Sequence, residues 1–461
     1  MSLRLDSGIR QDEKMTHSEY AELIMNSSPF RTLSDTKEIL VKRNGVYVPR
    51  GEIEIEEQCQ ILIPNCSTYM VQQVIKTIQR STYTDRERFD RFPHLINVQN
   101  GVYDLKEDEL RQQKPHELFR IQFPITYDPL AGPKKFMKFL MDCLPDYKDR
   151  ITVLEEMTSL FLRGLKLEKI YMHVGSGENG KSTIFSIIEA ISGKKNMAHI
   201  SIHDLINHRF ARAGLDGKIV NTYAEISNQE LKQLGVVKAL VSGDPIDVEK
   251  KGKEAFTMEN FARMFFSANE LPEIENFKHA ELRRFLVTKW SEQFKANPTQ
   301  EELDQGIKKR DINLKNELCK KEELSGILNL LLFHAKKLLE NEKFTYEQQT
   351  EQLQKEWQEK TDHIQEFVGN YLIREEGKSS PKSLVYESYK NWCIENKLIS
   401  KTERELNSKI KKSFEDSRVK IEGKTTVVWT NMSLGYPVTQ VTLSTVPKTK
   451  ENNLVGSKDV K

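Results

Sequence analysis

The chain has 461 residues, which is long enough for two to four domains with a sizeable core. Hydrophobic residues make up 38% and charged residues 30%, a balance typical of a soluble globular protein and not of a membrane-embedded one. The formal net charge of +2 is too small to indicate nucleic-acid binding by itself, so any basic surface must be local.

The cysteines and the apolar runs indicate an intracellular protein. The five cysteines include no C-x-x-C pair, which favours reduced thiols over a zinc site or a disulfide framework. No apolar run approaches 18 residues, and the N-terminus lacks the apolar core of a signal peptide. We therefore expect a cytoplasmic protein with no membrane partner.

Residues 1–135 are expected to form a small α+β module without an obvious catalytic constellation. The first 15 or so residues are polar and are predicted to be disordered. Asn-Gly pairs at positions 44–45 and 100–101 each lie between two stretches in which apolar and polar residues alternate, and each pair predicts a β-hairpin. A helical stretch from residue 134 to about residue 165 then leads into the next part of the chain.

Residues 169–193, KIYMHVGSGENGKSTIFSIIEAISG, predict a strand, a glycine-rich turn and a helix. The turn at residues 175–182 fills the pattern G-x-x-x-x-G-K-[ST] at every position, which is specific for nucleoside triphosphate binding when this context is present. Backbone N–H groups of such a loop surround phosphate oxygens at a helix N-terminus. The candidate nucleotide-binding residues are Gly175, Ser176, Gly177, Glu178, Asn179, Gly180, Lys181, Ser182 and Thr183.

Within this loop, Lys181 is expected to reach the β- and γ-phosphates and Ser182 to bind Mg²⁺. A second apolar strand is predicted at residues 218–225 and ends at Glu225. An acid at this place in a P-loop enzyme binds Mg²⁺ or orients the attacking water. The alternative is a carboxylate that merely ends a strand.

Residues 240–256 predict a hairpin whose tip carries Lys250, Lys251 and Lys253. Such a tip can neutralise phosphates of a nucleic acid, although a lysine-rich turn is more often simply solvated. Residues 261–269 predict a third buried strand that ends at Asn269, either a sensor of the γ-phosphate or a strand cap. Arg283 and Arg284 precede a fourth apolar strand, where an arginine can act on a neighbour's triphosphate or pair with a carboxylate.

The C-terminal third changes character twice. Residues 299–360 are highly charged and predicted to be a solvated helical bundle with one buried helix in its middle. Residues 361–436 predict three short helices and a terminal hairpin, the pattern of a winged helix, and residues 437–461 predict a disordered tail. Together with the module at 1–135 and an ATPase core at 136–298, this gives an α/β protein of several domains.

The ordered set of motifs between residues 175 and 285 resembles the superfamily 3 helicases of viruses and plasmids. It is most similar to the C-terminal part of phage and plasmid primases, which are related to the poxvirus primase-helicase. The likeness extends upstream through residues 97–105 and 124–139, and downstream to residues 386–393, so that it covers about residues 85 to 430.

This resemblance implies an AAA+-like P-loop core that binds ATP and Mg²⁺. Lys181 and Ser182 would serve the Walker A loop, Glu225 would be the Walker B acid that polarises the attacking water, and Asn269 would be the sensor. Arg284 would be the arginine finger, with Arg283 as the fallback. Lys250 and Lys251 would lie on the DNA-tracking hairpin of a hexameric ring that moves 3′ to 5′ on single-stranded or forked DNA.

Two features depart from the family pattern. Ala224 stands where many P-loop enzymes carry a second Walker B acid, which weakens the case for direct Mg²⁺ ligation by Glu225. The 84 residues before the resemblance contain no acidic metal cluster that could serve a primase, so primer synthesis would come from a separate primase partner.

The sequence therefore predicts an ATP-dependent DNA helicase for replication of a virus, plasmid or other mobile element, acting in the host cytoplasm. One alternative is a DNA-binding replication initiator that uses ATP as an assembly switch and unwinds little. Another is a P-loop kinase for a small molecule, against which the charged C-terminal modules and the lysine hairpin argue.

Overall fold

The computed structural model describes residues 15–226, 231, 234–252, 254–272, 283–346, 363–396, 398, 400–411, 413–421 and 423–435. The chain divides into two compact units, residues 1–357 and 358–461. Lys253 and both ends predicted to be disordered, residues 1–14 and 437–461, lie outside the described residues. None of the described helices is long and apolar enough to span a membrane.

The first unit begins with an α+β module, all of it described between residues 15 and 111. Its four-stranded sheet has the order β3-β2-β1-β4, and a second sheet has the order β5-β6-β7. Both predicted hairpins are present, as the pairs β2–β3 and β5–β6. The elements are α1 (His17–Ser27), β1 (Phe30–Leu33), β2 (Ile39–Arg43), β3 (Val46–Val48), α2 (Gly51–Leu62), α3 (Thr68–Ser81), β4 (Tyr83–Thr84), β5 (Leu95–Val98), β6 (Gly101–Asp104) and β7 (Glu109–Arg111).

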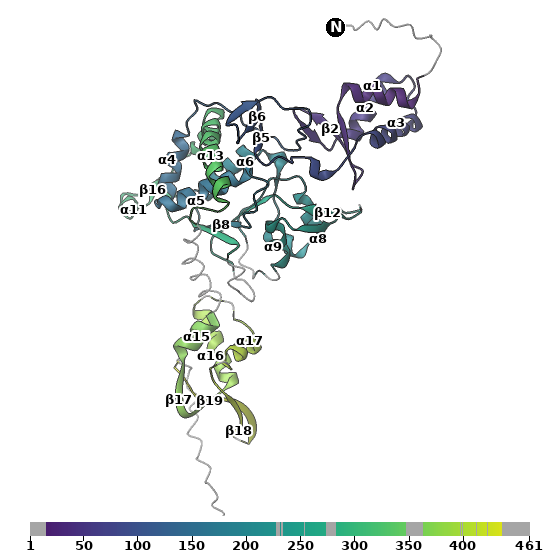
Figure 1. Ribbon diagram of the computed structural model, residues 1–461. Coiled ribbons are helices and arrows are strands. Elements are labelled where there is room, and N and C mark those ends of the chain that lie inside the picture. Colours follow the sequence, from purple (N-terminus) through teal and green to yellow (C-terminus); the bar gives the residue numbers. More distant parts are fainter. Residues whose placement is uncertain are drawn as a thin grey trace, which may run out of the picture. The chain divides into compact units, whose positions relative to one another are not determined.

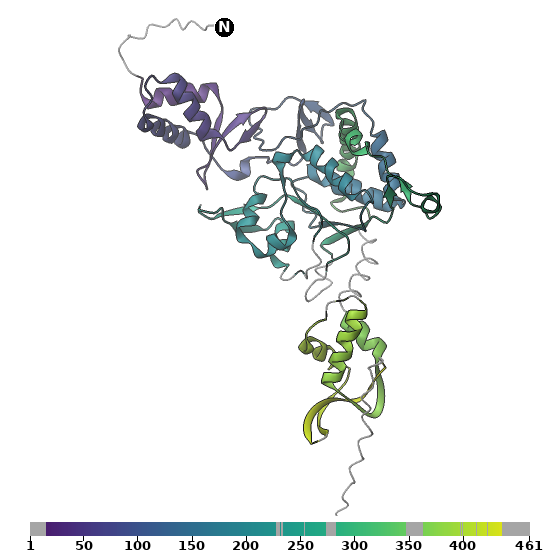
Figure 2. The same ribbon diagram turned by 180° about the vertical axis from the view of Figure 1, so that it is seen from behind.

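A parallel sheet forms the centre of the first unit, as Figures 1 and 2 show from opposite sides. Among the described residues it has five strands in the order β14-β8-β13-β10-β9. All neighbouring pairs are parallel, so the carboxyl ends of the strands meet at one edge. The strands are β8 (Ile170–Val174), β9 (Met197–Ala198), β10 (Val220–Tyr223), β13 (Arg263–Ala268) and β14 (Phe285–Lys289).

Helices cover both faces of this sheet because its strands alternate their buried side chains between two cores. Tyr171 and Phe265 face one core with α4, α5, α6 and α13, whereas Met172 and Phe266 face the other with α7 and α9. The covering elements are α4 (Lys134–Cys143), α5 (Tyr147–Thr158), α6 (Lys181–Ser192), α7 (Ile202–Asn207), α8 (Arg209–Arg212), α9 (Gly235–Ser242), β11 (Pro245–Val248) and β12 (Phe256–Glu259).

The charged segment after the sheet contains the buried helix that the sequence predicts, but this helix packs in the main core and not in a separate solvated bundle. The long helix α13 (Lys321–Asn341) buries Ile327, Leu328 and Leu331 in the core shared with α4 and α5. Its charges lie on the remaining face; the sequence predicted this buried helix but not the core in which it packs. Before it lie β15 (Phe294–Lys295), α11 (Gln300–Asp304), β16 (Lys308–Lys309) and α12 (Leu314–Leu318); residues 347–360 are outside the described part.

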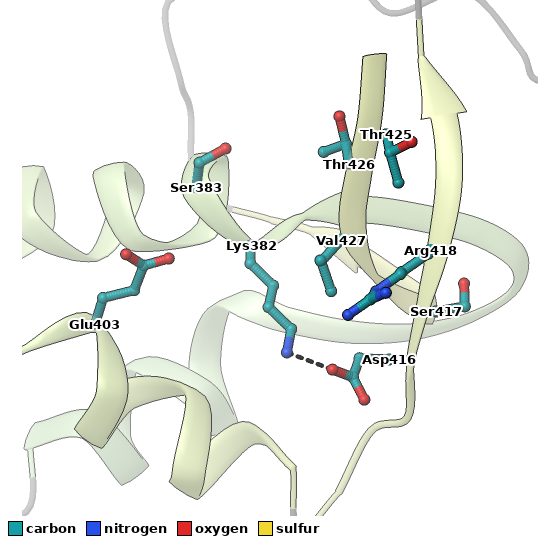
Figure 3. A pocket seen from close by; sticks show the side chains of 9 residues that line it. All are labelled: Lys382, Ser383, Glu403, Asp416, Ser417, Arg418, Thr425, Thr426 and Val427. Carbon is teal, nitrogen blue, oxygen red and sulfur yellow. Dashed lines mark hydrogen bonds and ion pairs between the residues drawn. The ribbon is translucent and has the colours of Figure 1, made fainter. Parts of the chain in front are cut away.

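The second unit has the three predicted helices and the predicted terminal hairpin. It also has a strand that we did not predict, β17, which pairs with β19 in a sheet of order β17-β19-β18. Lys382 begins α16 beside the hairpin and pairs with Asp416 at 2.5 Å (Figure 3). The described elements are α15 (His363–Tyr371), β17 (Leu372–Pro381), α16 (Lys382–Glu395), α17 (Glu403–Ile410), β18 (Asp416–Ile421) and β19 (Lys424–Leu434).

Candidate functional site

The glycine-rich loop connects β8 to α6, as the motif predicts. Gly180 has a φ of 99°, and a Cβ there would lie 2.7 Å from the Cys143 sulfur. A Cβ on Gly175 would lie 2.3 Å from the carbonyl oxygen of Trp290. The loop therefore needs glycine for its conformation at one position and for close packing at both.

Lys181 is the first residue of α6, and only 7% of it is exposed. Its ammonium group donates to the carbonyl oxygen of Gly175 and, at 3.1 Å, to the Asn179 side-chain oxygen. Burial lowers the pKa of Lys181, and the nearby Glu225 carboxylate opposes that shift. These neutral acceptors satisfy the ammonium group only partly, so an anionic ligand would bind it more strongly.

Asn179 fixes the loop to the neighbouring strand end, a role that the motif does not predict. Its amide group donates to the carbonyl oxygens of Trp290, at 3.0 Å, and Ser176, at 3.3 Å. The Trp290 indole N–H in turn donates to His173 Nδ1 at 2.9 Å, and His173 Nε2 lies 3.3 Å from the buried Glu156 carboxylate. Burial raises the pKa of Glu156. A series of buried polar contacts through Trp290, His173 and Glu156 thus stabilises the loop.

The other candidate residues at the carboxyl edge meet the loop in one cavity of about 760 Å³. Glu225 follows β10 with a φ of 61°, and its backbone N–H lies 3.4 Å from the Ser267 hydroxyl. Asn269 follows β13, directly after that strand. Glu225, Ser267 and Asn269 all line the cavity together with Lys181 and Ser182. The topology therefore brings Glu225 and Asn269 close to Lys181, although they follow it by 44 and 88 positions in the sequence.

The opposite wall of the cavity comes from segments whose role the sequence did not reveal. Phe139 from α4 and Phe294 contribute aromatic surface, and Ile312 adds an exposed apolar side chain. Arg310 also lines the cavity and lies 3.7 Å from Glu178 of the glycine-rich loop. Such a wall can hold a flat apolar group beside an anion. The charged composition of residues 299–320 carried no signal of this role.

The two arginines before β14 lie at the other edge of the sheet. Arg284 donates to the Glu168 carboxylate at 2.5 Å and to the Ser242 hydroxyl at 2.8 Å. Its own carbonyl accepts from Ile170, the first residue of β8, whereas the glycine-rich loop follows the last residue of β8. Arg283 is exposed, and its carbonyl accepts from Lys169 at 2.8 Å. Neither arginine lines this chain's own cavity.

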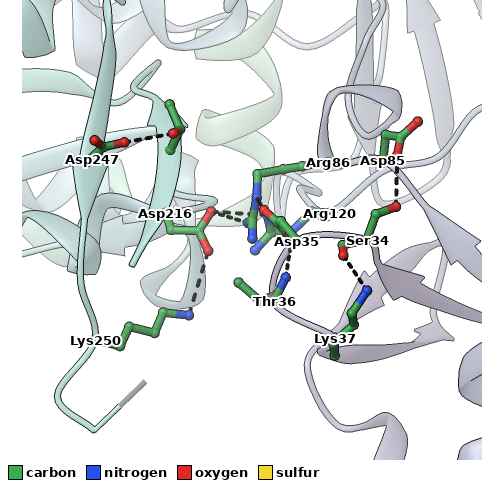
Figure 4. Close-up of polar contacts among 11 residues, drawn as sticks. Ser34, Asp35, Thr36, Lys37, Asp85, Arg86, Arg120, Asp216, Asp247 and Lys250 are labelled. Atoms are coloured by element: carbon green, nitrogen blue, oxygen red, sulfur yellow. Dashed lines mark hydrogen bonds and ion pairs between the residues drawn. The ribbon is translucent and has the colours of Figure 1, made fainter. Parts of the chain in front are cut away.

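The lysine-tipped hairpin is formed by the antiparallel strands β11 and β12. Lys250 is not free at its tip: it lies 3.8 Å from Asp216, which also pairs with Arg86 at 2.8 Å and Arg120 at 3.3 Å (Figure 4). Burial acts to raise the pKa of Asp216, but Arg120 and Arg86 outweigh burial and hold the pKa below its usual value. Lys251 is exposed at the turn.

No group of three or more His, Cys, Asp or Glu side chains that could hold a metal occurs within the part of the chain that the structure describes. Ser182 and Glu225 nevertheless line the same cavity. A cation there would draw its other ligands from water and from the phosphates of a nucleotide, which is how Mg²⁺ is usually bound in such sites.

Three stretches of the chain match known family models. A model described as "D5 N terminal like" matches residues 18–145, and one described as "Poxvirus D5 protein-like" matches residues 359–441. A third, described as "Family of unknown function (DUF5906)", matches residues 173–284. The last stretch contains the glycine-rich loop and the strand ends that line the cavity.

Several curated viral proteins are similar in sequence. "Putative helicase 184R" of Invertebrate iridescent virus 6 is 28% identical over 262 residues, or 52% of this chain and 26% of that protein. "Putative helicase L207/L206" of Acanthamoeba polyphaga mimivirus is 22% identical over 324 residues, or 67% of this chain and 34% of that protein. "Putative primase C962R" of African swine fever virus is 21% identical over 241 residues, or 48% of this chain and 25% of that protein.

The chain thus spans between 25% and 34% of the length of these viral relatives. Among solved structures, the apo structure of the NrS-1 C terminal region covers 91% of this chain and 100% of its own, with a TM-score of 0.49 and 12% identity.

Proposed function

We propose that this chain, which matches D5-like family models and is similar to viral putative helicases and primases, is an ATP-dependent DNA helicase. The observation that carries this proposal is the single cavity that Lys181, Ser182, Glu225 and Asn269 share at the carboxyl edge of a parallel sheet. In open α/β sheets this edge is where ligands bind. The proposed architecture is an AAA+-like P-loop core followed by a winged helix in the second unit.

The proposed roles follow from chemistry at each position. Lys181 and the backbone N–H groups at the start of α6 bind the phosphates of ATP, because the helix N-terminus and the ammonium group both favour anions. Ser182 would hold Mg²⁺, which would shield charge on the phosphates. Glu225 accepts a hydrogen bond from the attacking water, and Asn269 positions that water or contacts the γ-phosphate.

We propose that ATP hydrolysis is completed by a neighbouring subunit. Arg284 lies at the edge of the sheet opposite to its own loop, so it is placed to contact the triphosphate of a second copy. Arginine fingers supplied in this way stabilise charge that develops in the transition state. The proposed assembly is a hexameric ring that moves 3′ to 5′, as the resemblance to superfamily 3 helicases implies, and release of Arg284 from Glu168 would accompany assembly.

We propose that the β11–β12 hairpin contacts the DNA strand inside this ring. Lys251 is the described tip residue best placed for this contact, because it is exposed. Lys250 would first have to leave Asp216. This assigns the two lysines different parts: Lys251 contacts phosphates in every state, and Lys250 contacts them only when the hairpin moves.

The deciding experiment measures ATP hydrolysis with and without single-stranded DNA. We expect DNA to stimulate hydrolysis by the wild type and Lys181→Ala to abolish the activity. Lys194→Ala is the matched control, since Lys194 is an exposed lysine just beyond the same helix and pairs with Glu189 at the surface. Unwinding of a forked duplex then tests the motor directly.

Hydrolysis that does not respond to DNA would overturn the motor. Such a result, combined with ATP-dependent assembly on duplex origin DNA, would favour the ATP-switched initiator. Phosphate transfer to a nucleoside would instead favour a small-molecule kinase.

A further inference from the structure

The second unit has a polar hollow of about 680 Å³ between its hairpin and the starts of two helices (Figure 3). Lys382 of α16 and Glu403 of α17 lie on one side of it, and Asp416 and Arg418 of β18 lie on the other. Hydroxyl groups of Ser383 and Thr425 complete its lining. The lining of the hollow is more polar than apolar, so it suits a charged or polar partner.

The positive charges beside this hollow are not all neutralised. Lys382 is paired with Asp416 at 2.5 Å, and this pair holds the pKa of Asp416 below its usual value. Arg418, Lys420 and Lys424 are exposed, and within the described residues none of them makes an ion pair. Among the described residues the hairpin therefore carries three exposed cations without an ion pair, a local basic surface in a chain whose net charge is only +2.

These cations are arranged along the hairpin by its register. Arg418 lies opposite Val427 and Lys420 lies opposite Thr425, so the two cations project from the same face of β18. They lie two positions apart in sequence, which corresponds to about 6.6 Å along a strand. Each can therefore contact its own phosphate group. Lys424 follows the turn at Gly423, whose φ is 78°.

Helix α17 is, by contrast, poorly suited to approach a polyanion. Its first turn carries Glu403 and Glu405, with the single cation Arg404 between them. The Glu405 carboxylate accepts hydrogen bonds from the Thr402 backbone N–H, at 2.8 Å, and from the Thr402 hydroxyl, at 2.6 Å. The residues at the start of a recognition helix usually enter the major groove. Two carboxylates at that position would repel the flanking phosphates.

We propose that the second unit binds the phosphate backbone of DNA through the β18–β19 hairpin, with Arg418, Lys420 and Lys424, and not through α17. This rests on the proposed action of the chain on DNA and names which surface of the second unit takes part. Arg418 supplies bidentate hydrogen bonds to phosphate oxygens, and Lys420 and Lys424 supply point charges. Contacts of this kind do not depend on base sequence.

The test compares two matched double variants of the full chain. Arg418→Gln with Lys420→Gln removes two of the three exposed cations of the hairpin, and Arg404→Gln with Lys411→Gln removes the same charge from exposed positions on and just after α17. Binding of a fluorescent forked duplex is measured without nucleotide over a range of salt concentrations. Melting temperatures confirm that both variants are folded.

We expect the hairpin variant to bind more weakly, with a log–log salt slope less steep by about 1.8 for two lost duplex phosphate contacts. The α17 variant should keep the wild-type slope. A loss confined to the α17 variant, or wild-type slopes for both variants, would overturn the proposal; the second result would leave the second unit to a protein partner. Because this measurement needs no hydrolysis, it fails or succeeds separately from the DNA-stimulated ATPase test.

Discussion

The carboxyl and amino ends of the strands in the parallel sheet differ in the residues that could contact a nucleotide. At the carboxyl edge, Lys181, Glu225 and Asn269 line one cavity although they are far apart in sequence. At the other edge, Arg284 is held by Glu168 and Ser242 and has no access to that cavity. One chain therefore supplies the two halves of a proposed catalytic site on opposite sides, and a complete site would need two chains.

The largest expected effect concerns Arg284, the proposed arginine finger at the second edge. Replacing Arg284 with alanine should lower ATP turnover by roughly 10³-fold or more, because it removes the cation that stabilises transition-state charge. Binding of ATP should change little, since the cavity of the same chain is intact. Steady-state hydrolysis and nucleotide-binding titrations measure the two quantities separately.

A control and a mixing experiment make this test specific. Glu168→Gln breaks the ion pair without removing the arginine, so it should leave turnover near the wild-type value; equal losses in both variants would mean that the pair is only structural. Mixing Arg284→Ala with Lys181→Ala subunits should restore part of the activity. In mixed assemblies an intact loop can meet an intact arginine, and no recovery would argue against a shared site.

The next effect concerns the acid at the end of β10. Glu225→Gln keeps the size of the side chain but removes its charge, and we expect hydrolysis to fall by roughly 10²- to 10⁴-fold while ATP still binds. Glu270→Gln is the control, because Glu270 is an exposed carboxylate one residue beyond Asn269. If both variants hydrolyse ATP like the wild type, another group must orient the water.

The features of the carboxyl edge could be predicted from the sequence, because each of them is a local pattern. The glycine-rich loop, the strands that follow it and the polar residues at the strand ends are local patterns, and the structure has each of them. Parallel topology then brings the strand ends together without further information. The helices and terminal hairpin of the second unit were likewise local signals, although β17 was missed because its burial does not alternate.

Contacts between distant segments could not be predicted in the same way. Nothing near Trp290 or Arg310 in the sequence indicates that they approach the loop 111 or more residues earlier. The pairing of Lys250 with Asp216 depends on how the α+β module, through Arg86 and Arg120, surrounds that carboxylate. Similarly, α13 was predicted as a buried helix within a solvated bundle, because its own apolar residues are visible in the sequence and its packing partners in α4 and α5 are not.

A smaller effect is expected from removing the hydrogen bonds by which Asn179 holds the glycine-rich loop. Asn179→Ala removes buried hydrogen bonds to Trp290 and Ser176 and should lower the free energy of unfolding by about 1–3 kcal/mol. ATP affinity should fall as well, because the loop loses its anchor. Asn260→Ala is the matched control: Asn260 is also a buried amide, bonded to Leu240 and Ala262 away from the cavity.

Chemical unfolding and ATP titration separate the two roles of Asn179. The Asn260 variant should lose comparable stability and keep its ATP affinity. If the two variants lose ATP affinity equally, the effect reflects general destabilisation and Asn179 has no particular role in the loop.

The smallest expected effect concerns Arg310 on the far wall of the cavity. Its ion pair with Glu178 spans 3.7 Å between side chains that are 57% and 55% exposed, so Arg310→Ala should change stability by less than about 0.5 kcal/mol. ATP affinity should nevertheless fall a few-fold, and more at low salt, because a cation facing the phosphates is lost. Arg209→Ala removes a similar exposed arginine, paired with Glu249 at 3.4 Å and outside the cavity, and should leave affinity unchanged. If ATP affinity is the same in both variants, Arg310 only pairs with the loop; if it falls in Arg310→Ala alone, the segment between β15 and α12 is part of the nucleotide site.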